Sequence, residues 1–316
     1  SWQGKCPEYN QTTVIHFILF GLSSDPKIQI FLFVLFLVIY LITLLGNMLI
    51  ILVIKADPQL HTPMYFFLSN LSFLDICYTS VTIPKTLSNL LSEDQAISFL
   101  GCAAQMYFFL LFGSSECCLL AVMSYDRYVA ICNPMRYSLI MSRKVTISLA
   151  AVVWVMGNVV ACEQTAAIFT LPFHRTNIIN HFFCDVLPVL RLASTDTFLN
   201  DVVNGVLSVV FTIVPFILII TSYVCILSAT LKMRSAEGRH KAFSTCSSHL
   251  ITVTLFFGSC FITYMRPSSS ASVDTDRAIS LFYTVITPTF NPIIYSLRSK
   301  EVKEALRKLL GRSRIF

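Results

Sequence analysis

Asp75 and Glu116 carry the most informative chemistry of this 316-residue chain, because each places a carboxyl group well inside a long apolar stretch. An ionised carboxylate in such surroundings is costly and is usually paired or functional. Two carboxylates that meet require either a cation or a shared proton between them. The pair therefore indicates either a bound metal ion or a protonated, hydrogen-bonded pair of acids.

A second charged pair, Asp126 and Arg127, follows the apolar segment at about 95–125. An arginine at the end of a membrane helix can extend to the interface, and a neighbouring acid lowers its cost there. Pro134 and further basic residues come next, which is typical of a helix that leaves the bilayer on a positively charged side. Taken alone, the pair could also be the solvated end of any helix.

The composition predicts that these charges are embedded in a membrane protein. Hydrophobic residues make up 55% of the chain, charged residues only 13%, and the mean hydropathy is +0.71, which is too apolar for a soluble domain of this size. A helix needs roughly 20 residues to cross the hydrocarbon core of a bilayer. Nearly charge-free runs of sufficient length lie at about 28–54, 62–84, 95–125, 145–162, 202–231, 242–265 and 278–297.

We therefore expect an all-α membrane protein, a seven-transmembrane helix bundle with a short amphipathic eighth helix. Its expected parts are an extracellular N-terminal segment (1–27), the seven-transmembrane bundle (28–297), and a cytoplasmic amphipathic helix and tail (298–316). Val302, Ala305 and Leu309 share one side of the basic C-terminal segment, as in a helix that lies on the inner leaflet.

The distribution of positive charge predicts the orientation. Of the 23 lysine and arginine residues, 16 fall on the face that carries the C-terminal tail. Positive charge favours the cytoplasmic side, so we expect the tail in the cytoplasm and the N-terminus outside. The net charge of +6 is then mainly a topology signal and gives little reason to expect nucleic acid as a partner. No cleavable signal peptide is evident, and Asn10 begins a glycosylation sequon on the predicted outer side.

The expected depths of the two buried acids agree. Asp75 lies roughly 18 Å along its helix from Pro63, and Glu116 about 16 Å from Arg127, at the α-helical rise per residue. Since both distances are measured from the inner side, the two carboxyl groups can meet between helices.

Four stretches resemble rhodopsin-like G-protein-coupled receptors, and more closely the odorant-receptor branch of that class. Residues 123–137, which contain Asp-Arg-Tyr followed by Val-Ala-Ile-Cys-Asn-Pro, resemble the inner end of the third helix. Residues 63–75, 241–250 and 288–298 are similar to the branch's second, sixth and seventh helices, in the same order and at the same spacing. The resemblance implies a plasma-membrane receptor, not an enzyme, that transmits binding of a small volatile odorant to a stimulatory heterotrimeric G protein.

The resemblance also bears on ions and disulfides. Related receptors bind sodium at the position of Asp75, so we favour a structural sodium ion at Asp75 and Glu116 over a shared proton, and expect no other cofactor. A disulfide between Cys102 and Cys184 is implied, and an oxidising exterior makes it chemically reasonable. A metal site at Cys184 with neighbouring histidine and aspartate is the alternative, but a cysteine in a disulfide cannot donate a thiolate.

The chain departs from the family pattern in two places. His174 and Ser194 stand where odorant receptors usually have two more loop cysteines, so a second loop disulfide is expected to be absent. Lys241 stands where many rhodopsin-like receptors have an acid that pairs with the arginine of the third helix. We therefore expect Asp126 to be the partner of Arg127 in the resting state.

For activation, we expect the sixth helix to move outward while Arg127 turns from Asp126 toward the fifth and seventh helices. The Asn-Pro-x-x-Tyr motif breaks the helical hydrogen-bond ladder of the last span where the bundle can repack. Residues assigned to G-protein coupling and activation are Asp126, Arg127, Tyr128, Met135, Arg136, Tyr223, Asn291, Pro292 and Tyr295.

The predicted ligand site lies between the outer halves of the helices. Its side chains are mostly aromatic and aliphatic with a few hydroxyls, which suits a small apolar molecule with one hydrogen-bonding group. Such a ligand would bind with about micromolar affinity. The predicted set, of which about half is expected to touch ligand, is Met106, Phe109, Leu110, Gly113, Ser114, Asn204, Leu207, Ser208, Phe211, Phe257, Cys260, Phe261, Tyr264, Leu281 and Thr284.

Several other functions were weighed. A receptor for a non-odorant small metabolite is the main alternative. A transporter or channel would normally show repeats or several polar residues along a path, and only Asp75 and Glu116 fit such a description. A retinal protein would need a lysine in the last span, which has none, and no nucleophile, base and orienting group converge as an enzyme requires.

Overall fold

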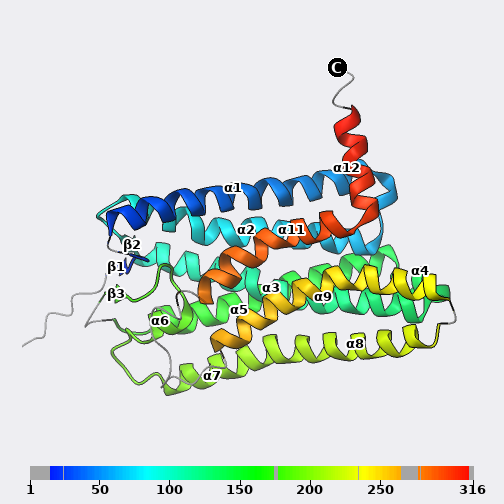
Figure 1. Cartoon of the computed structure of the whole chain (residues 1–316). Coiled ribbons are helices and arrows are strands. Elements are labelled where there is room, and N and C mark those ends of the chain that lie inside the picture. Colours follow the sequence, from blue (N-terminus) through cyan, green and yellow to red (C-terminus); the bar gives the residue numbers. More distant parts are fainter. Residues whose placement is uncertain are drawn as a thin grey trace, which may run out of the picture.

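The computed structural model describes residues 15–23, 25–173, 177–233, 235–264, 277 and 279–312. Long helices run side by side along one axis, as Figure 1 shows. Helices are expected because hydrocarbon cannot satisfy backbone N–H and C=O groups, so each span must satisfy its own. The long helices are α1 (Pro26–Ala56), α2 (Pro63–Leu91), α3 (Phe99–Cys132), α5 (Arg143–Phe169), α7 (Phe198–Ser208) with α8 (Val214–Leu231), α9 (Ala236–Tyr264) and α11 (Thr287–Arg298).

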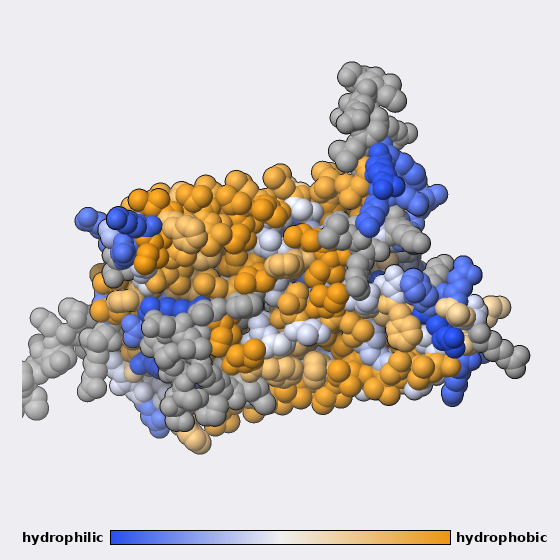
Figure 2. Space-filling model, viewed as in Figure 1, coloured by the Kyte–Doolittle hydropathy of each residue, from blue (hydrophilic) through white to orange (hydrophobic). Residues whose placement is uncertain are grey.

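Within the described residues, six helices are long and apolar enough to cross a membrane, and α11 with its preceding turn supplies a seventh. The predicted seven-helix fold is confirmed. Figure 2 shows a broad apolar band across the visible face of the bundle, with hydrophilic residues gathered at its two ends. Large side chains such as Leu52, Val155 and Ile217 are exposed along the spans, where lipid chains would cover them. We call the end predicted to face outside the outer end, and the opposite end the inner end.

Two helices extend beyond the predicted spans. The second was predicted to end near residue 84 and the fourth near residue 162, but they continue to Leu91 and Phe169. The predicted spans ended there because Lys85 and Glu163 interrupt the apolar runs. Lys85 instead donates from Nζ to the carbonyl oxygen of Ala96 at 2.6 Å, so its charge is accommodated within a continuing helix.

Two helical segments are wound as π-helix. The turn η3 (Val209–Ile213) joins α7 to α8, and η5 (Phe282–Ile286) precedes α11. Such turns are rare and occur frequently at functional sites. Both lie in the outer half of the bundle, so the outer segments of these two helices are rotated relative to ideal α-helices.

Short helical segments connect the spans. At the inner end these are η1 (Pro58–Leu60), η2 (Pro134–Arg136) and α4 (Tyr137–Ile140), and near the outer end α6 (Val186–Leu190) precedes α7. Local capping explains several boundaries: the Asp25 carboxylate accepts from the N–H of Lys27 at 2.9 Å at the start of α1. The Ser98 hydroxyl likewise accepts from the N–H of Gly101 at 3.0 Å, where α3 begins.

The predicted amphipathic eighth helix is α12 (Lys300–Arg312), which turns away from the bundle axis in Figure 1. Val302 and Ala305 are buried, as their shared side predicted. Lys308 forms an ion pair with Asp57 at 3.1 Å and so ties the helix to the first inner connection. The hydrogen bond from the Gln59 N–H and the nearby Lys308 ammonium lower the pKa of Asp57.

A three-stranded sheet at the outer end was not predicted. Strand β1 (His16–Leu19) pairs antiparallel with β2 (Ala96–Ser98) and parallel with β3 (Ile178–Ile179), giving the order β2-β1-β3. Phe17 and Leu19 are fully buried, whereas the alternate positions of β1 are exposed. Part of the predicted N-terminal segment therefore forms a covering layer over the bundle.

A disulfide joins Cys102, at the outer start of α3, to Cys184 in the connection before α6. This is the pairing that the family resemblance implied. Both cysteines pack in one apolar cluster with Phe17, Phe173 and Ile179. The sheet, the disulfide and the long connection consequently form one structural unit. Asn10 and His174, for which glycosylation and a lost disulfide were predicted, lie outside the described residues.

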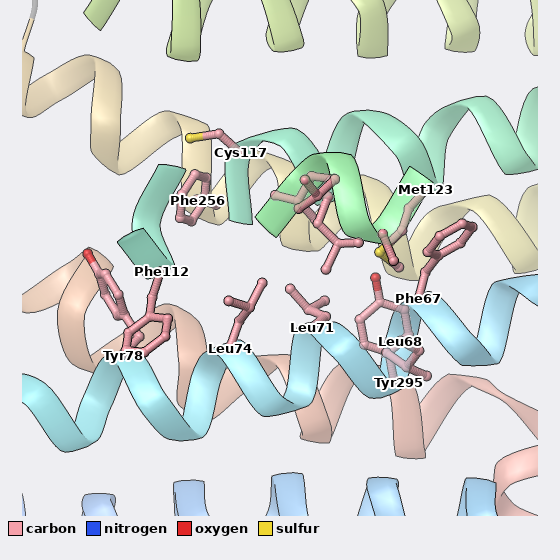
Figure 3. Packing of buried hydrophobic residues seen from close by; sticks show 14 of the residues in the cluster. Phe67, Leu68, Leu71, Leu74, Tyr78, Phe112, Cys117, Met123, Phe256 and Tyr295 are labelled. Carbon is pink, nitrogen blue, oxygen red and sulfur yellow. The ribbon is translucent and has the colours of Figure 1, made fainter. Parts of the chain in front are cut away.

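The main core lies between the helices below this unit. Figure 3 shows Leu68, Leu71 and Leu74 of α2 pointing from one face of that helix into the interior. Each is at least nine-tenths buried in the same cluster as Met123 and Tyr295. This apolar cluster packs α2 against α3 and α11.

We expect Phe17→Ala to destabilise the protein by about 3–5 kcal/mol, since it removes a fully buried aromatic side chain from a packed cluster. The ring of Phe17 packs against Phe99 and Phe173, with centroids 5.9 and 5.6 Å apart. Thermal unfolding of the detergent-purified protein measures the effect. Ile15→Ala, at a position 68% exposed, is the control and should unfold like wild type. Equal unfolding temperatures for both variants would contradict the proposed covering layer.

Candidate functional site

An apolar cavity of about 90 Å³ lies in the outer half of the bundle, between α3, α5, α7 with η3, and α9. Nine of the predicted ligand-site residues line it: Phe109, Leu110, Gly113, Ser114, Asn204, Leu207, Ser208, Phe211 and Cys260. We call this the outer cavity. Its remaining lining residues are Tyr78, Cys117, Val160, Gln164, Val186, Thr212 and Phe256.

Other predicted ligand-site residues lie outside the lining of the outer cavity. Met106 is buried in the apolar cluster under the sheet. Phe257 and Phe261 both pack against Phe216 of α8, with ring centroids 5.5 and 4.9 Å from it. Their contact with a ligand stays a prediction. The Thr284 hydroxyl donates to the carbonyl oxygen of Ser280 at 2.6 Å, Leu281 packs against the core, and the side chain of Tyr264 lies outside the described residues.

Two of the lining residues that sequence reasoning missed come from α5, a helix that contributed none of the predicted ligand-site residues. Val160 and Gln164 are four residues apart and so share one helix face. Gln164 is only 5% exposed, and its Nε2 donates to Oδ1 of Asn204 at 3.4 Å. An amide within an apolar helix was the available signal, since such a group needs an internal partner. Phe256, not Phe257, faces the cavity, because neighbouring residues of a helix point about 100° apart.

A buried polar cluster lies between α2, α3 and α11. Asp75 is fully buried, and Nδ2 of Asn291 lies 3.1 Å from each of its carboxylate oxygens. Glu116 is 1% exposed and interacts electrostatically with Asp75, whereas direct contact between the two carboxyl groups stays a prediction. Asn291 was not predicted as the partner of Asp75. From the sequence, Asn291 was assigned only to the Asn-Pro-x-x-Tyr motif and to G-protein coupling and activation.

The donor set of this cluster fits a hard cation. Oε1 of Glu116 and Oδ1 of Asn291 are buried and accept no hydrogen bond from the described residues. Together with Asp75, these groups present oxygen atoms, which alkali and alkaline-earth cations prefer. A cation or a shared proton would satisfy them.

A second polar cluster holds α1 against α11. Asn47 donates from Nδ2 to the carbonyl oxygens of Thr43 and Pro288, at 3.1 and 3.2 Å. The close approach of the two helices needs a glycine, since a Cβ atom at Gly46 would lie 3.1 Å from the ring of Pro292. Asn47 therefore faces the interior of the bundle, and its bond to Pro288 holds the helix that carries Asn291 in place.

The alternative metal reading of the long outer connection does not fit. Cys184 is in the disulfide, and Nε2 of His181 lies 3.0 Å from the hydroxyl of Ser280. Burial, aided by the charge of Arg277, lowers the pKa of His181 to about 3. Among the described residues, no group of three or more potential metal-binding side chains is found.

At the inner end, Asp126 and Arg127 are both buried but do not form the expected ion pair. Oδ1 of Asp126 accepts a hydrogen bond from the Tyr137 hydroxyl at 2.8 Å. No charged atoms of Asp126 and Arg127, both within the described residues, lie within 4.0 Å of each other. The prediction of this pair was wrong because α4 brings Tyr137 to the carboxylate. Burial and the neighbouring Asp126 raise the pKa of Tyr137, so its hydroxyl remains a donor.

Arg127 instead lines an inner cavity of about 570 Å³. Tyr295 of α11 lines the same cavity, as do Met64 and Tyr65 of α2 and Glu237 of α9. Helices α2, α3, α9 and α11 thus line the inner cavity, and each of them also surrounds the buried polar cluster or the outer cavity.

The other residues assigned to coupling are distributed around this end. The Tyr223 hydroxyl lies 2.7 Å from Nδ1 of His249, and Nε2 of that ring lies 3.1 Å from the carbonyl oxygen of Leu120, which links α8, α9 and α3. Met135 and Arg136 are exposed on η2, with Met135 95% exposed. Tyr128 is half-buried. These positions give an exposed rim next to the inner cavity.

We expect Tyr137→Phe to lower the free energy of unfolding by about 1–3 kcal/mol, because the buried Asp126 carboxyl group loses its donor. Thermal unfolding of the purified protein is the measurement. Tyr125→Phe is the matched control, since Tyr125 is 43% exposed and its hydroxyl makes no hydrogen bond to the described residues. If both variants unfold at the same temperature, the Tyr137 bond contributes nothing.

The comparison with known proteins extends the resemblance to nearly the whole chain. A family model described as olfactory receptor matches residues 36–313. Olfactory receptor 10P1 of Homo sapiens is 53% identical over 306 residues, which cover 96% of this chain and 98% of that receptor. Olfactory receptor 10A5 of Homo sapiens is 54% identical over 300 residues, covering 95% of each chain. Olfactory receptor 5G9 of Mus musculus is 48% identical over 307 residues, covering 97% and 98%.

A match to one family model over most of the chain agrees with the bundle, the disulfide and the two cavities described above. It also agrees with a multi-pass protein of the plasma membrane. The chain belongs to the olfactory receptor family, whose members are odorant-binding G-protein-coupled receptors and not enzymes.

Proposed function

We propose that this receptor is activated by a small, mostly apolar volatile molecule and that it then activates a stimulatory heterotrimeric G protein. The observation that supports this most is the pair of cavities at opposite ends of one bundle. Helix α3 contributes Phe109 and Ser114 to the outer cavity and Arg127 to the inner one. A change in packing at the outer cavity can therefore reach the inner one through a single continuous helix.

The lining of the outer cavity sets the proposed class of ligand. Its walls are mostly aromatic and aliphatic, and Ser114, Ser208 and Thr212 offer hydroxyls. None of the described residues that line it is charged, so a ligand would be held by apolar contact and one or two hydrogen bonds. About ten non-hydrogen atoms bound in this way give roughly micromolar affinity.

The proposed orientation follows from the positive charge at the inner end. The tail with α12 lies in the cytoplasm, and β1 with the N-terminus lies outside. The inner cavity then opens to the cytoplasm, where the C-terminal tail of a G protein would enter it. In the active state, Arg127 turns toward Tyr223 and Tyr295 as α9 moves outward. A weakly bound ligand suffices if it favours that state by a few kcal/mol.

Nucleotide exchange tests the proposal directly. The receptor in lipid vesicles is combined with a stimulatory heterotrimer, and GDP release is followed across a chemically broad panel of volatile compounds. Ion flux is recorded in the same vesicles, because a channel or transporter would show flux without exchange. Absence of accelerated GDP release for every compound, with folded protein and the tail on the G-protein side, would overturn the proposal.

We expect Arg127→Ala to abolish ligand-evoked cyclic AMP while leaving delivery to the cell surface intact, since the side chain lines the inner cavity. Cyclic AMP and surface labelling are measured in the same cells. Lys55→Ala, which removes an exposed positive charge at the end of α1, is the control and should respond normally. A normal response of Arg127→Ala would exclude the proposed role of the arginine.

We also propose that Asp75 and Glu116 hold a sodium ion. The buried oxygen atoms of Glu116 and Asn291 that accept no hydrogen bond from the described residues support this choice. When bound, the ion would offset one of the two carboxylate charges, and its ligands from α2, α3 and α11 would join these helices. A proton shared between the acids is the competing proposal.

Sodium should therefore stabilise the wild-type receptor. At constant ionic strength, replacing choline with sodium at about ten times its Kd should add about 1.4 kcal/mol to the free energy of unfolding. Asp75→Asn and Glu116→Gln should abolish this gain, because each removes a negative charge from the site. A wild-type stability that does not respond to sodium would favour the shared proton.

A further inference from the structure

Side chains fill the space directly above the outer cavity. Phe182, Phe183 and Cys184 of the long outer connection are buried, and Phe183 lies over α3 with its ring centroid 4.7 Å from that of Phe109. Val186 is buried and lines the cavity from the same side. The sheet and disulfide hold this cover in place. A ligand that reaches the outer cavity along the bundle axis would have to displace these buried side chains.

A different space adjoins the outer cavity from the side. A cavity of about 170 Å³ lies between the outer ends of α5 and α7, beside α6. Gln164 and Asn204 line both this side cavity and the outer cavity. The two spaces are therefore neighbours that share one wall, and the shared wall consists of two amide side chains.

The shared wall is held by a weak contact. Nε2 of Gln164 donates to Oδ1 of Asn204 at 3.4 Å, longer than the usual 2.9–3.0 Å for such bonds. A second bond across the side cavity runs from Nδ2 of Asn200 to the carbonyl oxygen of Ala167, at 3.0 Å. Helix α7 is short and continues into the π-helical turn η3. Rotation of one amide side chain would therefore connect the two cavities without unpacking the helices.

The charge of the side cavity is negative. Among the described residues of its lining, Glu163 alone is charged, and it is exposed near the outer end of α5. Arg191 and Asp201, which follow lining residues in the sequence, carry opposite charges. Neither of those two lines the cavity, so Glu163 is the charge that a molecule in the cavity meets most directly.

We propose that the side cavity is the access vestibule of the receptor, with the Gln164–Asn204 contact as its gate. It admits small uncharged molecules and amines, and it retards carboxylates. This inference rests on the proposed function, since it concerns how ligand reaches the outer cavity. The vestibule would select molecules by charge, which the outer cavity, whose described lining residues are uncharged, does not do.

Reaction of an engineered thiol measures access without a known agonist. Ser208 lines the outer cavity but not the vestibule, so Ser208→Cys reports arrival at the binding space. The probes are 2-aminoethyl and 2-sulfonatoethyl methanethiosulfonate, which differ in charge and are similar in size. Each forms a mixed disulfide with the thiolate and releases methanesulfinate. The modification rate of the peptide that contains residue 208 is followed by mass spectrometry.

Two further substitutions test the vestibule in the Ser208→Cys receptor. Ala167→Trp fills the vestibule and should slow modification by both probes by an order of magnitude or more. Ala166→Trp, at the exposed neighbouring position on α5, is the matched control and should change neither rate. The cationic probe should react about tenfold faster than the anionic one, and the isosteric Glu163→Gln should bring the two rates together.

Unchanged rates in Ala167→Trp, equal slowing in Ala166→Trp, or a charge preference that survives Glu163→Gln would each overturn the inference. Glu163→Gln preserves side-chain size, so it tests the charge even if the tryptophan variant fails to fold. These rates do not depend on activation. If no volatile compound activates the receptor but the thiol reacts in the expected pattern, the proposed function is refuted and the proposed vestibule is still supported.

Discussion

A polar side chain carried into a membrane-embedded bundle must find its partner within the protein, because hydrocarbon offers none. Asp75 meets this constraint through Asn291, and Asn47 meets it through the carbonyl oxygen of Pro288. These contacts join α1 and α2 to α11 near the middle of the bundle. Each contact forms only when its helix is rotated so that the polar side chain points inward. The buried polar groups therefore determine which helix faces are left to contact lipid, ligand and G protein.

The two ends of the bundle are stabilised in different ways. At the outer end, a disulfide and a small sheet tie the N-terminal strand to α3 and to the long connection, so the cover is rigid. At the inner end, the Tyr137 hydroxyl donates a hydrogen bond to the carboxylate of Asp126, and Arg127 lines a large cavity. A rigid cover at one end and a large cavity at the other suit a receptor that binds a small ligand on its outer side and a protein on its inner side.

Much of this arrangement could be predicted from the sequence. The spans followed from long apolar runs, and the burial of Asp75 and Glu116 within the bundle followed from their positions inside those runs. The sheet could not be predicted, because strands of two to four residues leave no periodic pattern and pair over 80 or more positions, as His16 does with Ser98. The face of α5 that carries Gln164, and the donation from Tyr137 to Asp126, depend on helix rotation and on the course of a connection. Neither property leaves a local signal in the sequence.

The π-helical turn η3 has a consequence for how receptors of this kind diversify. Phe211 and Thr212 belong to this turn and face the outer cavity. Loss or gain of one codon there would convert the turn to or from ordinary α-helix and rotate all residues on its outer side by about 100°. A single such event exchanges a whole set of cavity-lining side chains at once. The residues beyond it, which serve the signalling partner, keep their register and are inherited unchanged.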